Sequence, residues 1–209
     1  MRTLALETST PRGGVALFRD RDLVFSETFT ADRSHSSQLF GVIERALSPD
    51  GRPDQIAVGL GPGSYAGVRI AIAAAIGLSV ATGAELLGIP SVAALEEGEY
   101  LAIGDARRAT YSFAHVRNGE MVVAPMLLIR GELEARLADS PLPIFSSEEL
   151  GLPGAQIRFP SVDRIGRLAV EGRSICARGT LEPIYLREPH ITVAKEIRNS
   201  KFETRKGFG

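Results

Sequence analysis

The residues best placed for chemistry are a glycine-rich segment at 61–64, Gly-Pro-Gly-Ser, and a cluster at 7–9, Glu-Thr-Ser. Residues 55–60 form a short apolar run typical of a buried strand, and a run rich in alanine and isoleucine follows the glycines, as in a helix. A glycine turn between a strand and a helix favours an anion such as phosphate, because the first backbone amides of a helix lack partners. The residues that could face such an anion are Glu7, Thr8, Ser9, Gly61, Gly63 and Ser64.

Three interpretations of the glycine-rich segment are open to comparison. A P-loop ends in Gly-Lys-Ser/Thr, whereas residues 66–68 are Ala-Gly-Val, so the absence of lysine excludes it. A dinucleotide-binding turn fits the Gly-x-Gly-x-x-Ala pattern of 61–66. Against it, Pro62 removes an amide donor, and the acid about 20 residues on, Glu85, begins the next strand instead of ending it. The third is a tight turn that only lets strand and helix pack closely.

Other catalytic and metal-binding patterns are missing from the sequence. The cluster at 7–9 could face a phosphate or serve as ordinary hairpin chemistry. His35, His115 and His190 have no second histidine at ligand spacing, and the surroundings of Ser64 do not form a Gly-x-Ser-x-Gly elbow. The residues therefore predict a protein without a metal, a cofactor or catalytic residues of its own.

The composition of the chain restricts its expected compartment and binding partners. The 209-residue chain has a formal net charge of −1, so no global basic field attracts nucleic acid, and any RNA contact would be local or made through a partner. Cys176 is the only cysteine, which excludes an internal disulfide and fits a reducing compartment. Glu7 interrupts the only early apolar run, and the longest apolar stretch, 70–81, is short for a membrane span. These features predict a soluble cytoplasmic protein without a membrane partner.

The elements that must position the two segments follow from periodicity and turn residues. Expected in the first half are strands at 3–7, 15–18 and 23–29, a helix at 34–47, a strand at 55–60, a helix at 68–82, a strand at 85–89 and a short helix at 90–97. The first three strands are joined by short turns and are therefore antiparallel. The later strand–helix–strand crossovers should be right-handed, which makes their strands parallel with helices on the faces of the sheet.

The second half weakly repeats this opening. It should contain a strand at 101–105, a hairpin of 110–116 and 121–129 across Asn-Gly, a helix at 131–138, a strand at 142–146 and a helix at 162–171. We therefore predict an N-terminal lobe at 1–98 that carries the partner-binding helices, a smaller C-terminal lobe at 99–194 and a charged, flexible tail at 195–209.

Four segments carry a resemblance to a known family. They are Leu-Ala-Leu-Glu-Thr-Ser-Thr at 4–10, Arg-Ser-His-Ser at 33–36, Gly-Pro-Gly-Ser-Tyr-Ala-Gly-Val-Arg at 61–69, and Glu-Pro-Ile-Tyr-Leu-Arg at 182–187. The chain resembles the TsaB (YeaZ) family of bacterial tRNA threonylcarbamoyladenosine biosynthesis proteins, within the actin-like ATPase superfamily. The second half is similar only through 105–108 and 182–187. The resemblance implies a two-lobed actin-like (ribonuclease H-like) α/β fold. Its mixed sheet would have three antiparallel strands, then parallel strands, and its second lobe would be reduced.

The resemblance also implies a role. The catalytic relative TsaD has a metal-binding His-x-x-x-His pair after an Ile-Pro, and the corresponding positions here are Ala93 and Glu97, which cannot hold a transition metal. The family resemblance therefore implies a non-catalytic scaffold or activating subunit that binds TsaD and, with it, the ATPase TsaE. The complex transfers a threonylcarbamoyl group to an adenosine of tRNAs that read codons beginning with A, and this subunit would meet tRNA only through the complex. The alternative is an ATP-dependent small-molecule kinase of the same superfamily, for which Asp105 is the only candidate magnesium-binding acid.

The partner surface is expected on the helix at 68–82. On a helical wheel with about 100° per residue both sides of this helix are apolar, and a chain of this size has few elements to cover the second side. Arg69 marks that side as the one nearer solvent, and Ile76 stands where the family often has lysine. The predicted interface with TsaD, and with a second copy when the protein is alone, comprises Leu39, Val42, Ile43, Arg69, Ile72, Ala73, Ile76 and Val80. The alternative is a helix buried wholly within one domain.

Overall fold

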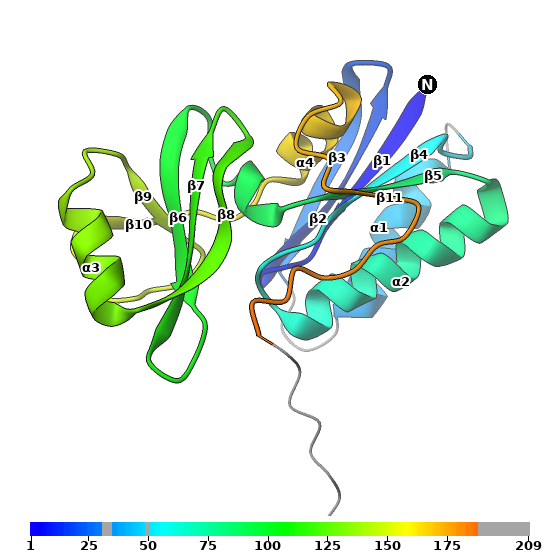
Figure 1. Ribbon diagram of the computed structural model, residues 1–209. Helices are drawn as coiled ribbons and strands as arrows, with labels where there is room; N and C mark the ends of the chain where they lie inside the picture. Colours follow the sequence, from blue (N-terminus) through cyan, green and yellow to red (C-terminus); the bar gives the residue numbers. More distant parts are fainter. Residues whose placement is uncertain (31–34, 49–50, 188–209) are drawn as a thin grey trace, which may run out of the picture.

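The computed structural model describes residues 1–30, 35–48 and 51–187, which form two lobes side by side, each built on its own sheet (Figure 1). The predicted tail at 195–209 lies outside the described residues. The first sheet has the order β11-β5-β4-β1-β2-β3. Its strands are β1 (Arg2–Glu7), β2 (Arg12–Arg19), β3 (Asp22–Thr30), β4 (Gln55–Gly59), β5 (Glu85–Ile89) and β11 (Ala177–Arg178).

Strand directions in this sheet confirm the predicted mixed topology. β1 pairs antiparallel with β2, and β2 with β3, whereas β1, β4 and β5 are parallel neighbours. Two helices, α1 (His35–Leu47) and α2 (Tyr65–Thr82), cover one face, and α4 (Val162–Val170) covers the other. Successive strand residues point to opposite faces, so Leu4 and Leu6 pack beneath α1 and α2 while Ala5 packs beneath α4.

The second sheet has the order β10-β9-β6-β7-β8. It consists of β6 (Glu99–Asp105), β7 (Thr110–Arg117), β8 (Glu120–Ile129), β9 (Ile144–Ser146) and β10 (Ala155–Ile157), and α3 (Arg130–Ala138) packs on one face. At the β7–β8 turn Asn118 and Gly119 both have positive φ, 51° and 82°, which is the turn that Asn-Gly predicts. The short helix expected at 90–97 is instead a 3-10 helix, η1 (Ser91–Ala94).

The predicted boundary of the second lobe is wrong. The sequence predicts one lobe for residues 99–194, but α4 and β11 complete the first lobe. Val162 and Ile165 share a buried cluster with Ala5 and Phe18, and β11 pairs with β5. Periodicity reveals that 162–170 is an amphipathic helix, yet it carries no information about which sheet the apolar side covers.

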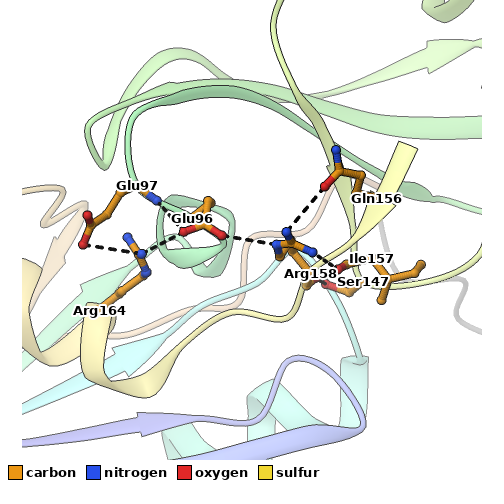
Figure 2. A network of polar contacts seen from close by, with 7 residues as sticks. All are labelled: Glu96, Glu97, Ser147, Gln156, Ile157, Arg158 and Arg164. Carbon is orange, nitrogen blue, oxygen red and sulfur yellow. Dashed lines mark hydrogen bonds and ion pairs between the residues drawn. The ribbon is translucent and has the colours of Figure 1, made fainter. Parts of the chain in front are cut away.

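A polar network joins the two lobes where the chain passes from η1 to β6 (Figure 2). Glu96, which follows η1, accepts hydrogen bonds from Arg158 Nε at 3.2 Å and Arg164 Nη2 at 2.9 Å. Arg158 follows β10 of the second lobe, and Arg164 belongs to α4 of the first. The hydrogen bond from the backbone amide of Glu97 has the largest effect on the pKa of Glu96 and lowers it, and the two arginines lower it further. One carboxylate therefore holds groups from both lobes.

Helix α2 is longer than the apolar stretch at 70–81 suggests. By length and composition alone its 18 residues would suffice to cross a membrane, but in this fold one of its sides packs on the first sheet.

Candidate functional site

The two segments predicted to face an anion meet at the ends of β1 and β4. These neighbouring parallel strands deliver the chain to the same edge of the sheet, where the Glu-Thr-Ser turn contacts the glycine-rich loop. The backbone amide of Ser64 donates to the carbonyl oxygen of Ser9 at 2.6 Å, and Thr8 Oγ1 donates to the carbonyl oxygen of Gly67 at 2.8 Å. A β-carbon at Gly63 would come within 2.3 Å of the Ser9 carbonyl oxygen, so the glycine is needed for this approach.

Most polar groups of this junction bond to one another. Thr8 and Ser9 are fully buried, and the Ser9 amide donates to Glu7 Oε1 at 2.5 Å. The Gly61 amide donates to Ser91 Oγ at 2.9 Å. Ser64 caps α2, its Oγ accepting from the Gly67 amide at 3.2 Å. The structure thus brings all six predicted anion-facing residues together, in the arrangement that the close-packing interpretation describes.

Glu7 is the unusual member of the junction. Its side chain is buried, and this desolvation raises the pKa of the carboxyl group against the opposing effect of its hydrogen bonds. Among the described residues, Glu7 Oε2 and Ser9 Oγ have no hydrogen-bond partner. A β-carbon at Gly59 would lie 1.9 Å from Glu7 Oε2, so the glycine makes room for the acid. Burial therefore favours the neutral acid over a carboxylate that could hold a cation.

The positions that match the metal ligands of TsaD are not built for a metal. Ala93 is buried in the core, while Glu97 has an 84% exposed side chain that faces Arg164 Nη2 at 3.5 Å. Within the described ranges, no three His, Cys, Asp or Glu side chains gather as a metal site. Asp105, the acid required by the kinase alternative, is in an ion pair with Arg107 at 3.2 Å.

The predicted partner surface is divided between solvent and core. Arg69, Ala73, Ile76 and Val80 lie on the solvent side of α2, with Ile76 44% and Val80 84% exposed. Ile72 is only 7% exposed and packs in the cluster beneath the helix. We call the four solvent-facing residues the α2 stripe.

For α1 the prediction is wrong as to which side chains are exposed. Leu39, Val42 and Ile43 are at most 5% exposed, because they hold α1 against the first sheet. The exposed apolar residue is Phe40, at 53%. The apolar arc of this helix is wide enough to allow either orientation, so its sequence alone does not identify the buried side.

Sequence reasoning missed the segment 181–187, which we call the strap. It follows β11, crosses the start of α2 and is held by Leu181 in the core and by the Ile184 amide, which donates to the Leu60 carbonyl oxygen at 2.9 Å. Figure 1 shows it running from β11 along α2 toward the second lobe. The only signal for it in the sequence was its place among the family-like segments.

The strap and α2 form the two walls of a groove. Arg69 Nε donates to Tyr185 Oη at 2.8 Å, and the Arg69 guanidinium carbon lies 4.0 Å from the centre of the Tyr65 ring. The hydrogen bond to Tyr185 raises the pKa of Arg69. The groove has a volume of about 460 Å³, with Ile72, Ala73 and Ile76 on one wall and Glu182, Pro183 and Tyr185 on the other. Apolar side chains line the groove together with the polar residues Arg69, Glu182 and Tyr185, a mixture that is typical of a site for another chain.

Comparisons with known proteins agree with the resemblance predicted from the sequence. A profile of the family described as TsaD, tRNA N6-adenosine threonylcarbamoyltransferase, matches residues 29–124. The tRNA threonylcarbamoyladenosine biosynthesis protein TsaB of Escherichia coli is 30% identical over 111 residues, which cover 51% of this chain and 48% of that protein. An uncharacterized Mycobacterium tuberculosis protein is 32% identical over 131 residues, 58% of this chain and 62% of that protein. The matches thus span about half to three fifths of these relatives.

Two solved structures share the fold. One is an uncharacterized Pseudomonas aeruginosa protein described as similar to peptidase YEAZ; it has a TM-score of 0.71 and 24% identity, and the match covers 89% of this chain and 99% of that one. The other is YeaZ from Pseudomonas aeruginosa, with a TM-score of 0.70 and 21% identity over 88% of this chain and 100% of that one. The predicted resemblance to the TsaB (YeaZ) family and the predicted actin-like fold are both confirmed.

Proposed function

We propose that this chain is a non-catalytic scaffold or activating subunit in the synthesis of threonylcarbamoyladenosine in tRNA. It would bind the catalytic paralogue TsaD in the cytoplasm and, together with TsaD, the ATPase TsaE. The observation that carries the proposal is the α2 stripe: an apolar helix side, exposed in the lone chain, that begins at the family-like segment 61–69. The likeness to TsaB of Escherichia coli supports the pathway.

The non-catalytic part of the proposal has separate support. The loops that an actin-like ATPase would turn toward phosphates are bonded to each other, and Glu7 is buried beneath them. Ala93 and Glu97 replace the metal-binding pair of TsaD. Chemistry would therefore belong to the partner, and tRNA would be met through the complex.

The partner would cover the α2 stripe, and a second copy of this chain would occupy the same surface when the protein is alone. Exposed apolar side chains such as Ile76 and Val80 gain stability when another chain removes them from water. On α1 the exposed residue Phe40 would contribute to this surface, in place of the core residues Leu39, Val42 and Ile43.

Ile76→Arg tests the proposal against a matched control. Ile76 and Val122 have similar exposure, 44% and 46%, but Val122 lies on β8 of the second lobe. In light scattering and in titrations with purified TsaD, Ile76→Arg should be folded, monomeric and unable to bind. Val122→Arg should behave like the wild type. Unchanged TsaD binding by folded Ile76→Arg would overturn the assignment of the surface, and wild-type protein that never binds TsaD would overturn the function.

A further inference from the structure

The strap touches both the proposed partner surface and the second lobe. At one end Tyr185 accepts a hydrogen bond from Arg69 of the α2 stripe, and its ring centre lies 5.5 Å from that of Tyr65. Two residues later, Arg187 Nη2 donates to the carbonyl oxygen of Arg107 at 3.1 Å and to Thr110 Oγ1. A stretch of three residues therefore links the start of α2 to the turn between β6 and β7.

That turn has a strained backbone. Arg107, Arg108 and Ala109 have φ values of 65°, 55° and 56°, a left-handed run that non-glycine residues rarely adopt. Hydrogen bonds hold it: the Arg107 amide donates to Asp105 Oδ1 at 2.7 Å, and Thr110 Oγ1 donates to the Arg107 carbonyl oxygen at 2.9 Å. Arg187 binds the same carbonyl oxygen and the same hydroxyl group, so the strap ends on a turn whose backbone is held by hydrogen bonds.

The other end holds an arginine that would otherwise be free to move. Arg69 is exposed on the surface of α2, and a long side chain there has many rotamers, whose loss on binding weakens affinity. Here the guanidinium group stacks on the Tyr65 ring and donates to Tyr185, so its position is set before a partner arrives. The polar rim of the groove is thus preorganised.

We propose that the strap is a positioning element through which the second lobe sets the affinity of the α2 groove for the partner protein. Tyr185 fixes Arg69 at the rim of the groove, and Arg187 fixes Tyr185 by anchoring the strap on the β6–β7 turn. The occupant of the groove is the partner of the proposed function, on which this inference rests, and a second copy is a distinguishable outcome. The second lobe then influences binding without contacting the partner.

A double-mutant cycle in the full chain tests the first step. The dissociation constant for purified TsaD is measured for wild type, Tyr185→Phe, Arg69→Ala and the double variant. Loss of one hydrogen bond should weaken binding about fivefold in Tyr185→Phe. In the Arg69→Ala background the same change should have no further effect, because Tyr185 acts through Arg69. Tyr111→Phe, at a half-buried tyrosine of β7, is the matched control and should bind like wild type.

The second step is tested at the far end of the strap. Arg187→Ala should weaken TsaD binding severalfold while circular dichroism stays unchanged, and Arg187→Lys should restore part of the affinity, because lysine still donates to the turn. Arg117→Ala removes another arginine of the second lobe, one paired with Glu99, and should have no effect. Homodimerisation, measured by light scattering in the same series, shows whether a second copy uses the same groove.

The outcomes separate the two proposals. If the wild type does not bind TsaD, the proposed function fails. If the wild type binds and Tyr185→Phe and Arg187→Ala bind equally well, the proposed function stands and the positioning role is overturned. Independent, additive effects of Tyr185→Phe and Arg69→Ala would also overturn it, because they would mean that Tyr185 does not act through Arg69.

Discussion

Gly67 lies so close to Thr8 that a β-carbon at position 67 would come within 2.0 Å of the Thr8 carbonyl oxygen. The Glu-Thr-Ser turn and the start of α2 therefore touch through their backbones. The sequence predicted that these two segments could face an anion such as phosphate, and in the structure they contact each other. Because the two backbones are in contact, a substitution that disturbs this junction should lower the free energy of unfolding.

Gly67→Ala should destabilise the chain by about 1–3 kcal/mol, because the new methyl group forces the two backbones apart. Gly77→Ala is the matched control in the same helix: nothing lies within 4 Å of its β-carbon position, so the alanine should stabilise by up to about 1 kcal/mol. Urea denaturation of the three proteins checks both signs. Equal stability of Gly67→Ala and wild type would contradict the close contact.

Glu7 should give the wild type a pH-dependent loss of stability. Its carboxyl pKa is raised above the ordinary value of 4.5 by burial, so the folded state holds its proton to higher pH than the unfolded state. Stability from this group is complete below 4.5 and declines as pH rises from there through the raised folded pKa. Glu7→Gln cannot ionise and should lack this decline.

Chemical denaturation of wild type and Glu7→Gln at several pH values measures the difference. Glu27→Gln provides a control of opposite sign, because Arg45 lowers the pKa of Glu27 and its stabilisation is lost as pH falls through that lowered value. A difference between wild type and Glu7→Gln that does not change with pH would exclude the proposed titration.

Neighbouring residues of α1 should respond in opposite ways. Leu39→Ala removes a fully buried side chain and should cost about 2–5 kcal/mol of unfolding free energy. Phe40→Ala trims a half-exposed side chain and should change stability little, while weakening binding to TsaD or to a second copy. Thermal denaturation and a binding titration of both variants distinguish core from surface, and the reverse pattern would mean that α1 is oriented differently.

The isolated chain should not turn over ATP. The hydroxyl group of Thr8 and the backbone amides of Ser9, Gly61 and Ser64 make their hydrogen bonds within the junction. The glycine-rich loop also carries no lysine. Calorimetry with ATP and magnesium should show at most weak binding, and a phosphate-release assay should show no turnover. Release at about one per second or faster would support the kinase alternative instead.

The sequence by itself determined the local elements and the family resemblance. Short apolar runs separated by turn residues predicted β1 to β3, Asn118-Gly119 predicted the β7–β8 turn, and the run after Ser64 predicted α2. The solvent side of α2 was also predictable, because the single charged residue Arg69 distinguishes it from the other side. All these signals are local in the sequence. Within one helix, strand or turn, the backbone geometry determines from the spacing of two residues whether their side chains point to the same side.

Only the tertiary structure decided which faces meet. Val162 and Ile165 pack on the first sheet, and Leu39 is buried while Phe40 is exposed. The burial of these side chains depends on surfaces that are far away in the sequence. The link from Arg69 through Tyr185 to Arg187 and Thr110 joins segments that are 116 and 77 residues apart in the sequence. Periodicity reports that a side chain is apolar or polar, whereas its partner is selected by the packing of the whole fold.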